Sequence, residues 1–112
     1  MKINFSRKQI EIPVKKVGFF GKISGLMFRT RQTENLLFDF ETATRMSFHS
    51  FFVFFDFLII WLDEKNNVID YEICRPFRAR ISTGKSFKKV VEVPLNRNNA
   101  KILRFFDGKR KV

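Results

Sequence analysis

The amino-acid sequence predicts a mainly β protein, a compact β-sandwich or barrel with one short helix. Phenylalanine dominates the apolar residues, with 16 Phe against one Tyr and one Trp, and such side chains favour the half-buried surface of a sheet. The apolar stretches are short and are separated by turn-forming residues, as in all-β domains. A chain of 112 residues has the usual size of one domain. We therefore expect a single domain over residues 1–112, with a frayed basic tail over residues 107–112.

The first third of the chain predicts one strand and the helix. Apolar and polar residues alternate over residues 10–14, which is the period of a half-buried strand. Pro13 lacks an N–H donor, so this strand is expected at a sheet edge or with a bulge. Over residues 19–27 the apolar residues recur at helical spacing, which predicts the short helix. Gly21 and Gly25 weaken this helix by about 1 kcal/mol each, so it depends on tertiary packing.

The rest of the chain predicts strands joined by turns and one long loop. Runs rich in Phe, Ile, Leu and Val predict strands at residues 36–40, 48 with 51–55, 57–62, 68–73, 87–93 and 102–106. Residues 63–67 predict the turn of a hairpin, because asparagine tolerates positive φ. Residues 75–86 are polar and basic and contain Pro76 and Gly84, which predicts a long loop.

Neither a membrane span nor a secretion signal is expected. Residues 46–62 are the most apolar stretch, but they are fewer than the ~20 residues of a spanning helix and include His49 and Asp56. The first residues lack the apolar segment of a signal peptide. The lone cysteine, Cys74, fits a reducing compartment. These features predict a cytoplasmic protein without a membrane span.

The formal net charge is +11, and it is distributed unevenly along the chain. Eight basic residues face one acidic residue in 1–33, two face eight in 34–72, and twelve face two in 73–112. A polarised basic surface attracts polyanions. We therefore predict a non-enzymatic binding module for a polyanion, namely structured RNA or a ribonucleoprotein such as the ribosome. One alternative is that the basic surface binds an acidic protein. Another is that the excess of basic residues is a general adaptation of the host's proteins and serves no partner.

The residues expected to contact nucleic acid are the clustered basic residues and two nearby phenylalanines. The cations would contact phosphates and the aromatic rings would stack on bases. These residues are Lys15, Lys16, Arg31, Arg75, Arg78, Arg80, Lys85, Lys88, Lys89, Phe77 and Phe87.

The sequence shows no catalytic constellation. His49 and Cys74 are the only residues of their kinds, which is too few for a common zinc site, and a Cys–His nucleophile pair is less expected than burial of both. Residues 18–24 contain two glycines and a lysine, but Ile23 stands where a phosphate loop requires Ser or Thr. Several carboxylates lie in the middle of the chain, and no spacing selects a glycosidase pair. We expect no enzyme activity, no cofactor and no metal.

The motif Gly25-Leu26-Met27-Phe28-Arg29 resembles that of the domain of unknown function family 192. Further stretches are similar to the family pattern: Asn-Leu-Leu-Phe-Asp-Phe at 35–40, Ile-Ile-Trp-Leu-Asp at 59–63, Arg-Pro at 75–76 and Val-Val-Glu-Val-Pro at 90–94. Ser-Phe-His at 47–49 with Phe-Phe-Val at 51–53 is similar to archaeal members. The resemblance spans residues 10–95 and implies a jelly-roll-like sandwich or barrel with one short helix.

The resemblance also implies a cleft, and the chain departs from the family there. Leu58 stands at the position where the family carries an aspartate, while Asp56 lies two residues earlier. A small polar cleft lined by Arg29, His49 and Glu92 is the site that the resemblance implies. Its functional alternatives are a small-molecule or sugar-binding sandwich and a structural subunit of a larger assembly.

Overall fold

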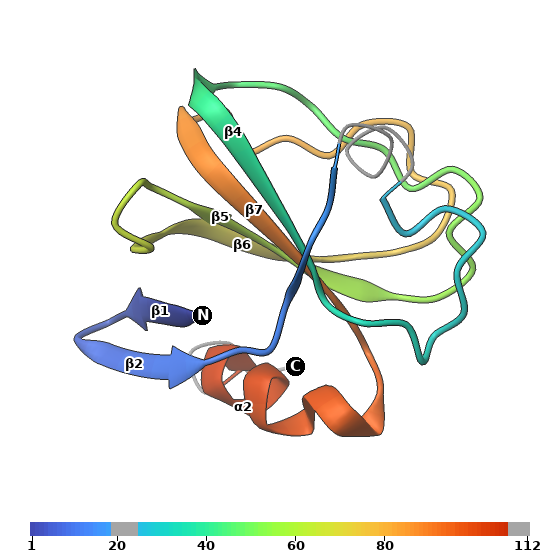
Figure 1. Ribbon diagram of the computed structural model, residues 1–112. Helices are drawn as coiled ribbons and strands as arrows, with labels where there is room; N and C mark the ends of the chain where they lie inside the picture. The colour runs from blue at the N-terminus through green and yellow to red at the C-terminus, as the bar shows by residue number, and fades with distance from the viewer. Residues whose placement is uncertain (19–24, 108–112) are drawn as a thin grey trace.

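The computed structural model describes residues 1–18 and 25–107, which form a five-stranded sheet with a smaller layer against one of its faces (Figure 1). The strand order in the sheet is β3-β4-β7-β5-β6, and only the pair β3–β4 is parallel. The strands are β3 (Lys15–Lys16), β4 (Leu36–Thr44), β5 (Phe57–Leu62), β6 (Val68–Cys74) and β7 (Phe87–Pro94).

The smaller layer consists of a β-hairpin and a helix. The antiparallel strands β1 (Lys2–Phe5) and β2 (Lys8–Glu11) form the hairpin. A 3-10 turn, η1 (Arg97–Asn99), leads into α2 (Ala100–Asp107). Figure 1 shows the hairpin and α2 together against one face of the sheet. Their apolar side chains, among them Ile3, Ile10 and Phe106, form one core cluster with the sheet.

Strand β5 is buried on both faces, which explains the apolar run in the middle of the sequence. It lies between β7 and β6, with Ile59 opposite Glu92 on one side and Glu72 on the other. Since successive side chains of a strand point to opposite faces, Leu58 and Ile60 join the core under the helix. Ile59 and Trp61 join a second core cluster on the other face of the sheet. None of the described residues forms a helix long and apolar enough to cross a lipid bilayer.

Loops rather than a second regular layer cover that other face. The second core cluster includes the loop residues Leu26, Val53, Phe55 and Ile81 together with side chains of the sheet. Phe48 pairs with Ile81 through an isolated bridge, and its ring lies 6.1 Å from that of Phe87. The fold is therefore mainly β and sandwich-like, without closure into a barrel.

Two predicted strands are wrong. Residues 48 and 51–55 form a loop with one bridge residue, because Phe52 has a positive φ and the amide of Val53 bonds to the carbonyl of Ser50 within the loop. Residues 102–106 are helical, since Ile102 and Phe106 lie one turn apart on a buried face. Asn96, whose side chain accepts a hydrogen bond from the amide of Asn99, caps the preceding 3-10 turn.

The other predicted strands and the hairpin turn are confirmed, with shifts at their ends. The strand predicted at residues 10–14 corresponds to β2, which begins and ends earlier and pairs with β1 in a hairpin. Pro13 lies just after β2. The helix predicted at residues 19–27 falls mostly outside the described residues, and Gly25 to Phe28 form a turn. The α-helix of the described chain is instead α2. The predicted frayed tail also lies outside the described residues, from residue 108 onward.

Candidate functional site: an arginine–phenylalanine surface and a cavity at Glu92

Three loops meet at one end of the sheet, and one buried serine joins two of them. Ser50 Oγ donates to the carbonyl of Arg75 at 2.7 Å and accepts from the amide of Arg78 at 2.7 Å. The Ser50 carbonyl accepts from the amide of Phe77, and its amide donates to the carbonyl of Arg78. The third loop is attached by a bond from the amide of Phe28 to the carbonyl of Phe52 at 2.8 Å. Residues 25–33, 48–56 and 75–81 thus form one loop end.

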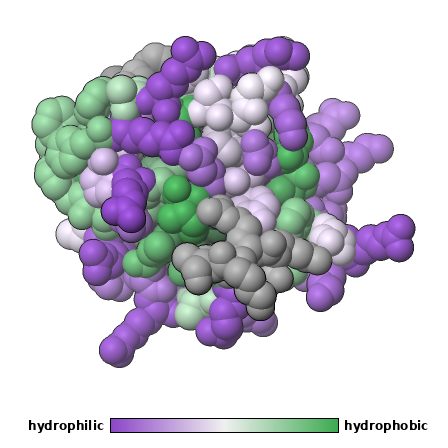
Figure 2. All heavy atoms as spheres, turned by 180° about the vertical axis from the view of Figure 1, so that it is seen from behind, coloured by the Kyte–Doolittle hydropathy of each residue, from purple (hydrophilic) through white to green (hydrophobic). Residues whose placement is uncertain are grey.

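Exposed phenylalanines gather on this loop end. The exposed fractions are 70% for Phe28, 45% for Phe52, 59% for Phe54 and 50% for Phe77. The rings of Phe28 and Phe52 stack with centroids 5.0 Å apart, and Phe77 meets Phe52 and Phe54 edge to face. Figure 2 shows a pale green area at the left edge of the molecule, the side on which these loops lie when the view is reversed. Contiguous exposed apolar area of this kind marks an interaction site.

Three of these phenylalanines have a left-handed backbone conformation. Their φ angles are 60° for Phe28, 60° for Phe52 and 57° for Phe77. Bulky residues rarely adopt positive φ, and such strain costs on the order of 1–3 kcal/mol per residue and clusters at functional sites. The side chains are exposed, so core packing does not explain the strain. The loops hold aromatic rings outward at a cost in stability.

The positively charged residues of this loop end are all arginines. Its three segments contain five arginines and no lysine, against a single acid, Asp56. Arg78 pairs with Glu72, and Arg29 donates to the carbonyl of Gly25 at 3.0 Å. The remaining three, Arg31, Arg75 and Arg80, are exposed and form no ion pair with a described residue. We call the exposed set of Phe28, Phe52, Phe54, Phe77, Arg31, Arg75 and Arg80 the arginine–phenylalanine surface.

The predicted lysines lie away from this surface, and most have acidic or polar partners. Asp39 contacts Lys88 at 2.8 Å and Lys16 at 3.9 Å, and the hydrogen bond from Lys88 lowers the pKa of its carboxyl. Lys15 lies 3.8 Å from Glu34. Lys89 donates to the side chain of Asn66 at 2.8 Å. Lys85 is exposed in the turn before β7.

The predicted stacking role of Phe87 is wrong. Its side chain is 1% exposed and belongs to the core between the sheet and the loops. Phe87 begins β7, and its ring packs edge to face against that of Phe40 at 5.9 Å. Of the two predicted stacking residues, only Phe77 is available to a base.

A cavity of about 220 Å³ lies beneath the turn that contains the Gly-Leu-Met-Phe-Arg motif. Its walls are mainly apolar, and its polar lining groups are Ser47, His49 and Glu92. The apolar lining residues are Leu26, Phe38, Met46, Phe48, Val53 and Phe57, with Gly25 at the turn. The structure thus brings His49 and Glu92 to one cavity, whereas Arg29 is not among its lining residues. Phe28 of the motif points outward and is 70% exposed.

Glu92 is the exceptional residue of this cavity. It lies in the central strand β7, with Leu36 and Ile59 opposite on the neighbouring strands. Its side chain is 5% exposed, and Oε1 has no hydrogen-bond partner in the described chain. Burial away from water raises the pKa of its carboxyl to about 8, since desolvation disfavours the charged form. Glu92 therefore carries its proton at neutral pH.

Gly25 lets the turn approach this carboxyl. Its φ is +51°, and a Cβ at this position would lie 3.2 Å from Glu92 Oε1 and 3.4 Å from the ring of Phe38. Only glycine meets both conditions without strain. His49 stands at the cavity with an exposed ring, and its Nδ1 accepts from the amide of Phe51 at 3.2 Å. A neutral His49 would then carry its proton on Nε2.

Leu58 and Cys74, which the sequence also singles out, have structural roles. Leu58 is 1% exposed and faces the core under the helix, so it does not line the cavity at Glu92. Cys74 is fully buried, and burial raises the pKa of its thiol to about 12. A thiol of that kind is not a nucleophile at neutral pH. Among the described residues, no group of three or more His, Cys, Asp or Glu is placed to hold a metal ion.

Two solved structures share this fold. A protein of unknown function from Novosphingobium aromaticivorans matches with a TM-score of 0.73 over 90% of this chain and 75% of that protein, at 15% identity. A proposed transcription regulator from Sinorhizobium meliloti matches with a TM-score of 0.72 over 91% of this chain and 81% of that protein, at 21% identity. At these identities the likeness concerns the fold alone.

The chain belongs to the DUF192 family of uncharacterised proteins, whose sequence pattern matches residues 3–104. Two relatives described as UPF0127 proteins come from species of Thermococcus. The protein of Thermococcus sibiricus is 32% identical over 79 residues, and that of Thermococcus gammatolerans is 35% identical over 80 residues. Each match covers 69% of this chain and 51% of the relative. The chain thus spans about half the length of these curated relatives, and the resemblance seen in the motifs is confirmed.

The sequence does not single out most of the exposed phenylalanines. Phe52 and Phe54 lie in a run of five apolar residues, 51–55, which has the composition of a buried strand. Their exposure depends on the turn at Phe52 and on hydrogen bonds to a loop about 25 residues further along the chain. The signal that points to them is the number of arginines in the three loops, since arginine and aromatic residues together are typical of binding surfaces.

Proposed function

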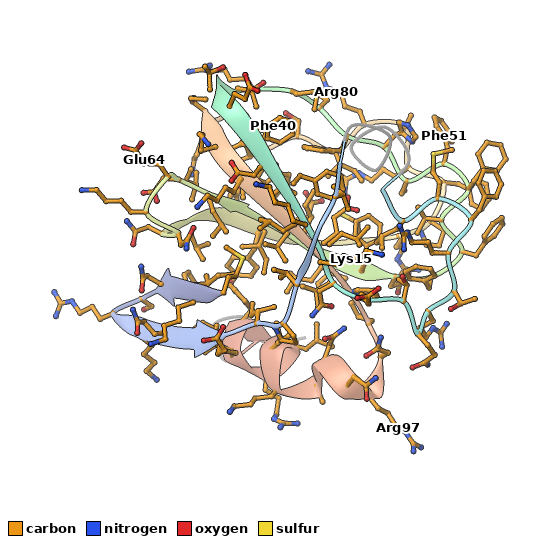
Figure 3. The ribbon with its side chains drawn as sticks, in the orientation of Figure 1. Lys15, Phe40, Phe51, Glu64, Arg80 and Arg97 are labelled. Atoms are coloured by element: carbon orange, nitrogen blue, oxygen red, sulfur yellow. The ribbon has the colours of Figure 1, made fainter. Side chains whose placement is uncertain are left out.

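We propose that this protein is a non-enzymatic RNA-binding module and that the arginine–phenylalanine surface is its contact surface. The observation that carries the proposal is that exposed Phe and Arg side chains come from three loops joined at one end of the sheet. Figure 3 shows Arg80 projecting outward from one of these loops. Aromatic rings stack on bases, and arginine both pairs with phosphate and stacks on rings. The net charge of +11 adds long-range attraction to a polyanion.

The chemistry of the surface favours unpaired bases within a structured RNA. Paired bases are stacked inside a duplex, whereas bases in loops and bulges are open to aromatic side chains. The Phe77 ring projects between Phe52 and Phe54, so it offers a platform beside Arg75. A ribosomal or other ribonucleoprotein RNA is the class of partner that we propose, in keeping with the cytoplasmic location expected from the sequence.

The structure revises which residues this proposal uses. Lys15, Lys16 and Lys88 lie near acidic side chains on the sheet. We therefore assign them to the long-range electrostatic attraction of RNA and not to direct contact with its phosphates. Arg31, Arg75 and Arg80 remain as phosphate contacts. Arg31 borders a cavity of about 330 Å³ together with Phe54, Pro76 and the acidic residue Asp56, so we assign Arg31 a phosphate contact at the rim of this cavity rather than inside it.

Binding of a fluorescent stem-loop RNA across a salt titration tests the proposal. We expect the double variant Arg75→Glu/Arg80→Glu to lose at least tenfold in affinity, and the slope of log K against log salt to become shallower by about 0.7–0.9 per phosphate contact removed. The matched control, Lys8→Glu/Lys101→Glu, makes the same change in net charge at exposed positions outside the loop end. It should lose much less.

Two results would contradict this function. Absence of binding by the wild-type protein at low salt would show that its charge does not serve RNA. Equal losses in the two double variants would show that only the overall field matters and that the loops form no RNA site. If an acidic protein binds to the same surface with one-to-one stoichiometry while RNA does not, the surface belongs to a protein assembly.

A further inference from the structure

The cavity beneath Gly25 combines a mainly apolar wall with one carboxyl that has an oxygen no described residue satisfies. Buried polar groups are nearly always hydrogen-bonded, and leaving one without a partner costs about 1–3 kcal/mol. Glu92 is 95% buried on the central strand of the sheet and lines the cavity, and its Oε1 lies 3.2 Å from the Cβ position of Gly25. A leucine or glutamine there would avoid the cost of a buried carboxyl. A buried carboxyl of this kind suits a ligand that carries a hydrogen-bond donor.

We propose that this cavity binds a small organic amine with a compact apolar body, whose N–H groups donate to the carboxyl of Glu92. The body of the ligand would contact Leu26 and Val53, while Ser47 and His49 stand at the cavity with exposed side chains. Nothing in this site overlaps the exposed rings of Phe52, Phe54 and Phe77. The inference therefore does not depend on RNA binding.

The size of the cavity limits the ligand. Its volume of about 220 Å³ exceeds the ~150 Å³ of an engineered apolar cavity that takes up benzene. It is below the ~300–1,000 Å³ of sites for drug-sized ligands. A benzene ring with one short polar substituent therefore fits, whereas a nucleotide or a disaccharide does not.

The lining selects an amine over an alcohol or an acid. An ionised carboxylate is an acceptor only, and its bonds to a charged donor are about twice as strong as those between neutral groups. Phe38, Phe48 and Phe57 also line the cavity, and aromatic faces attract ammonium ions. A carboxylic acid ligand would be ionised at neutral pH, and the lining contains no lysine or arginine to pair with its charge.

Binding of an amine should change the protonation of Glu92. Burial raises the pKa of its carboxyl to about 8, so Glu92 holds a proton at pH 6.5 to 7 before the amine binds. An alkylamine, like lysine, is an ammonium ion at that pH. The ammonium–carboxylate pair forms only if the carboxyl proton leaves to solvent, so close to one proton is released per ligand. The other titratable groups around Glu92 are His49 at the cavity and Cys74 in the same core cluster, and burial keeps the Cys74 thiol protonated.

Benzylamine and benzyl alcohol, which share one apolar body, test the inference by NMR and calorimetric titration of the full chain without RNA. We expect benzylamine to bind at least fivefold more tightly, to shift the amide signals of Gly25 and Ser47, and to release a proton at pH 6.5. Glu92→Gln preserves the shape of the side chain but removes its charge. It should abolish the preference for the amine and the proton release, whereas the exposed control Glu41→Gln should keep both.

The inference is overturned by any of three results. Equal affinity for the amine and the alcohol would show that the carboxyl of Glu92 is not the acceptor. Retention of the preference in Glu92→Gln would place the amine elsewhere. Absence of binding by benzylamine at millimolar concentration would show that the cavity does not admit this class of ligand. The first and third results need no variant, so they hold whether or not Glu92→Gln folds.

Discussion

The lack of a side chain at Gly25 leaves room for the carboxyl of Glu92 beside it. A Cβ on Gly25 would stand 3.2 Å from Glu92 Oε1, closer than most real contacts of that kind. The turn over residues 25–28 can therefore approach the sheet at the place where the central strand carries its carboxyl. The two residues belong to separate parts of the family pattern, Gly-Leu-Met-Phe-Arg and Val-Val-Glu-Val-Pro, and the fold brings them together.

Replacement of Gly25 by alanine should destabilise the protein by about 2–4 kcal/mol. A positive φ costs an alanine roughly 1–2 kcal/mol, and the crowding against Glu92 and Phe38 adds to that cost. Urea unfolding followed by circular dichroism measures the change.

Gly84→Ala is the matched control for that measurement. Gly84 also has a positive φ, 73°, but a Cβ there meets no heavy atom within 4 Å. The difference between the two variants isolates the contact with Glu92. Equal losses would show that the backbone conformation alone explains the need for glycine at position 25.

Stability should fall as the pH rises from about 4.5 to 8 because of Glu92. Burial raises the pKa of its carboxyl from 4.5 to about 8, so in this range the folded protein holds a proton that the unfolded chain releases. The unfolded state then binds fewer protons, and the free energy of unfolding decreases by up to about 1.4 kcal/mol per pH unit. Asp39 and Asp63, whose pKa values are lowered, lose their contributions only at more acidic pH.

Glu92→Gln separates this effect from other titrations. Glutamine has the same shape and no proton to lose, so the slope between pH 5 and 8 should flatten, and the variant should be the more stable protein at pH 8. Urea midpoints at five or six pH values give the two curves. Parallel curves for wild type and variant would mean that the Glu92 carboxyl is not buried as the structure has it.

The sheet could be predicted from local pattern, and the elements that depend on distant contacts could not. Residues 57–62 read as a strand because every side chain is apolar, and the structure places β5 there between two core clusters. Residues 51–55 are also all apolar but form a loop, since the carbonyl of Phe52 accepts from the amide of Phe28 and the amide of Val53 donates to the carbonyl of Ser50. The apolar residues of 102–106 fit a short strand or a helix, and the hydrogen-bonded turn at Asn96 favours the helix.

The candidate sites also combine features that the sequence predicts with features that depend on distant contacts. His49 and Glu92 could be linked to a cleft through the family pattern, but the burial of Glu92 follows from its place between Leu36 and Ile59. The basic residues were evident from composition, whereas their partners were not. Asp39 lies near both Lys16 and Lys88 only because β3, β4 and β7 are neighbours in the sheet. Charge in a sequence indicates a class of partner, and the fold determines which cations remain available.

Ser50→Ala should weaken RNA binding without the removal of any cation. The hydroxyl holds the backbone of Arg75 and Arg78, and its loss leaves a carbonyl and an amide without their partner, at about 1–3 kcal/mol of stability. We expect this destabilisation together with a loss of a few-fold in RNA affinity, because the rings and guanidinium groups of the loop end are no longer held together. Urea unfolding and RNA titration measure the two effects. The exposed control Ser86→Ala should change neither.

Phe77→Asn should separate binding from stability at the arginine–phenylalanine surface. Asparagine tolerates the left-handed conformation that Phe77 adopts at φ 57°, so relief of strain offsets the loss of ring contacts with Phe52 and Phe54. Stability should therefore change by less than about 1 kcal/mol. A base that stacks on the ring loses about 1–3 kcal/mol, so RNA affinity should fall at least fivefold. Phe77→Tyr keeps the aromatic face and should retain binding. If Phe77→Asn binds RNA as tightly as the wild type, the exposed rings do not serve as base platforms, and the strain at these three positions serves another partner.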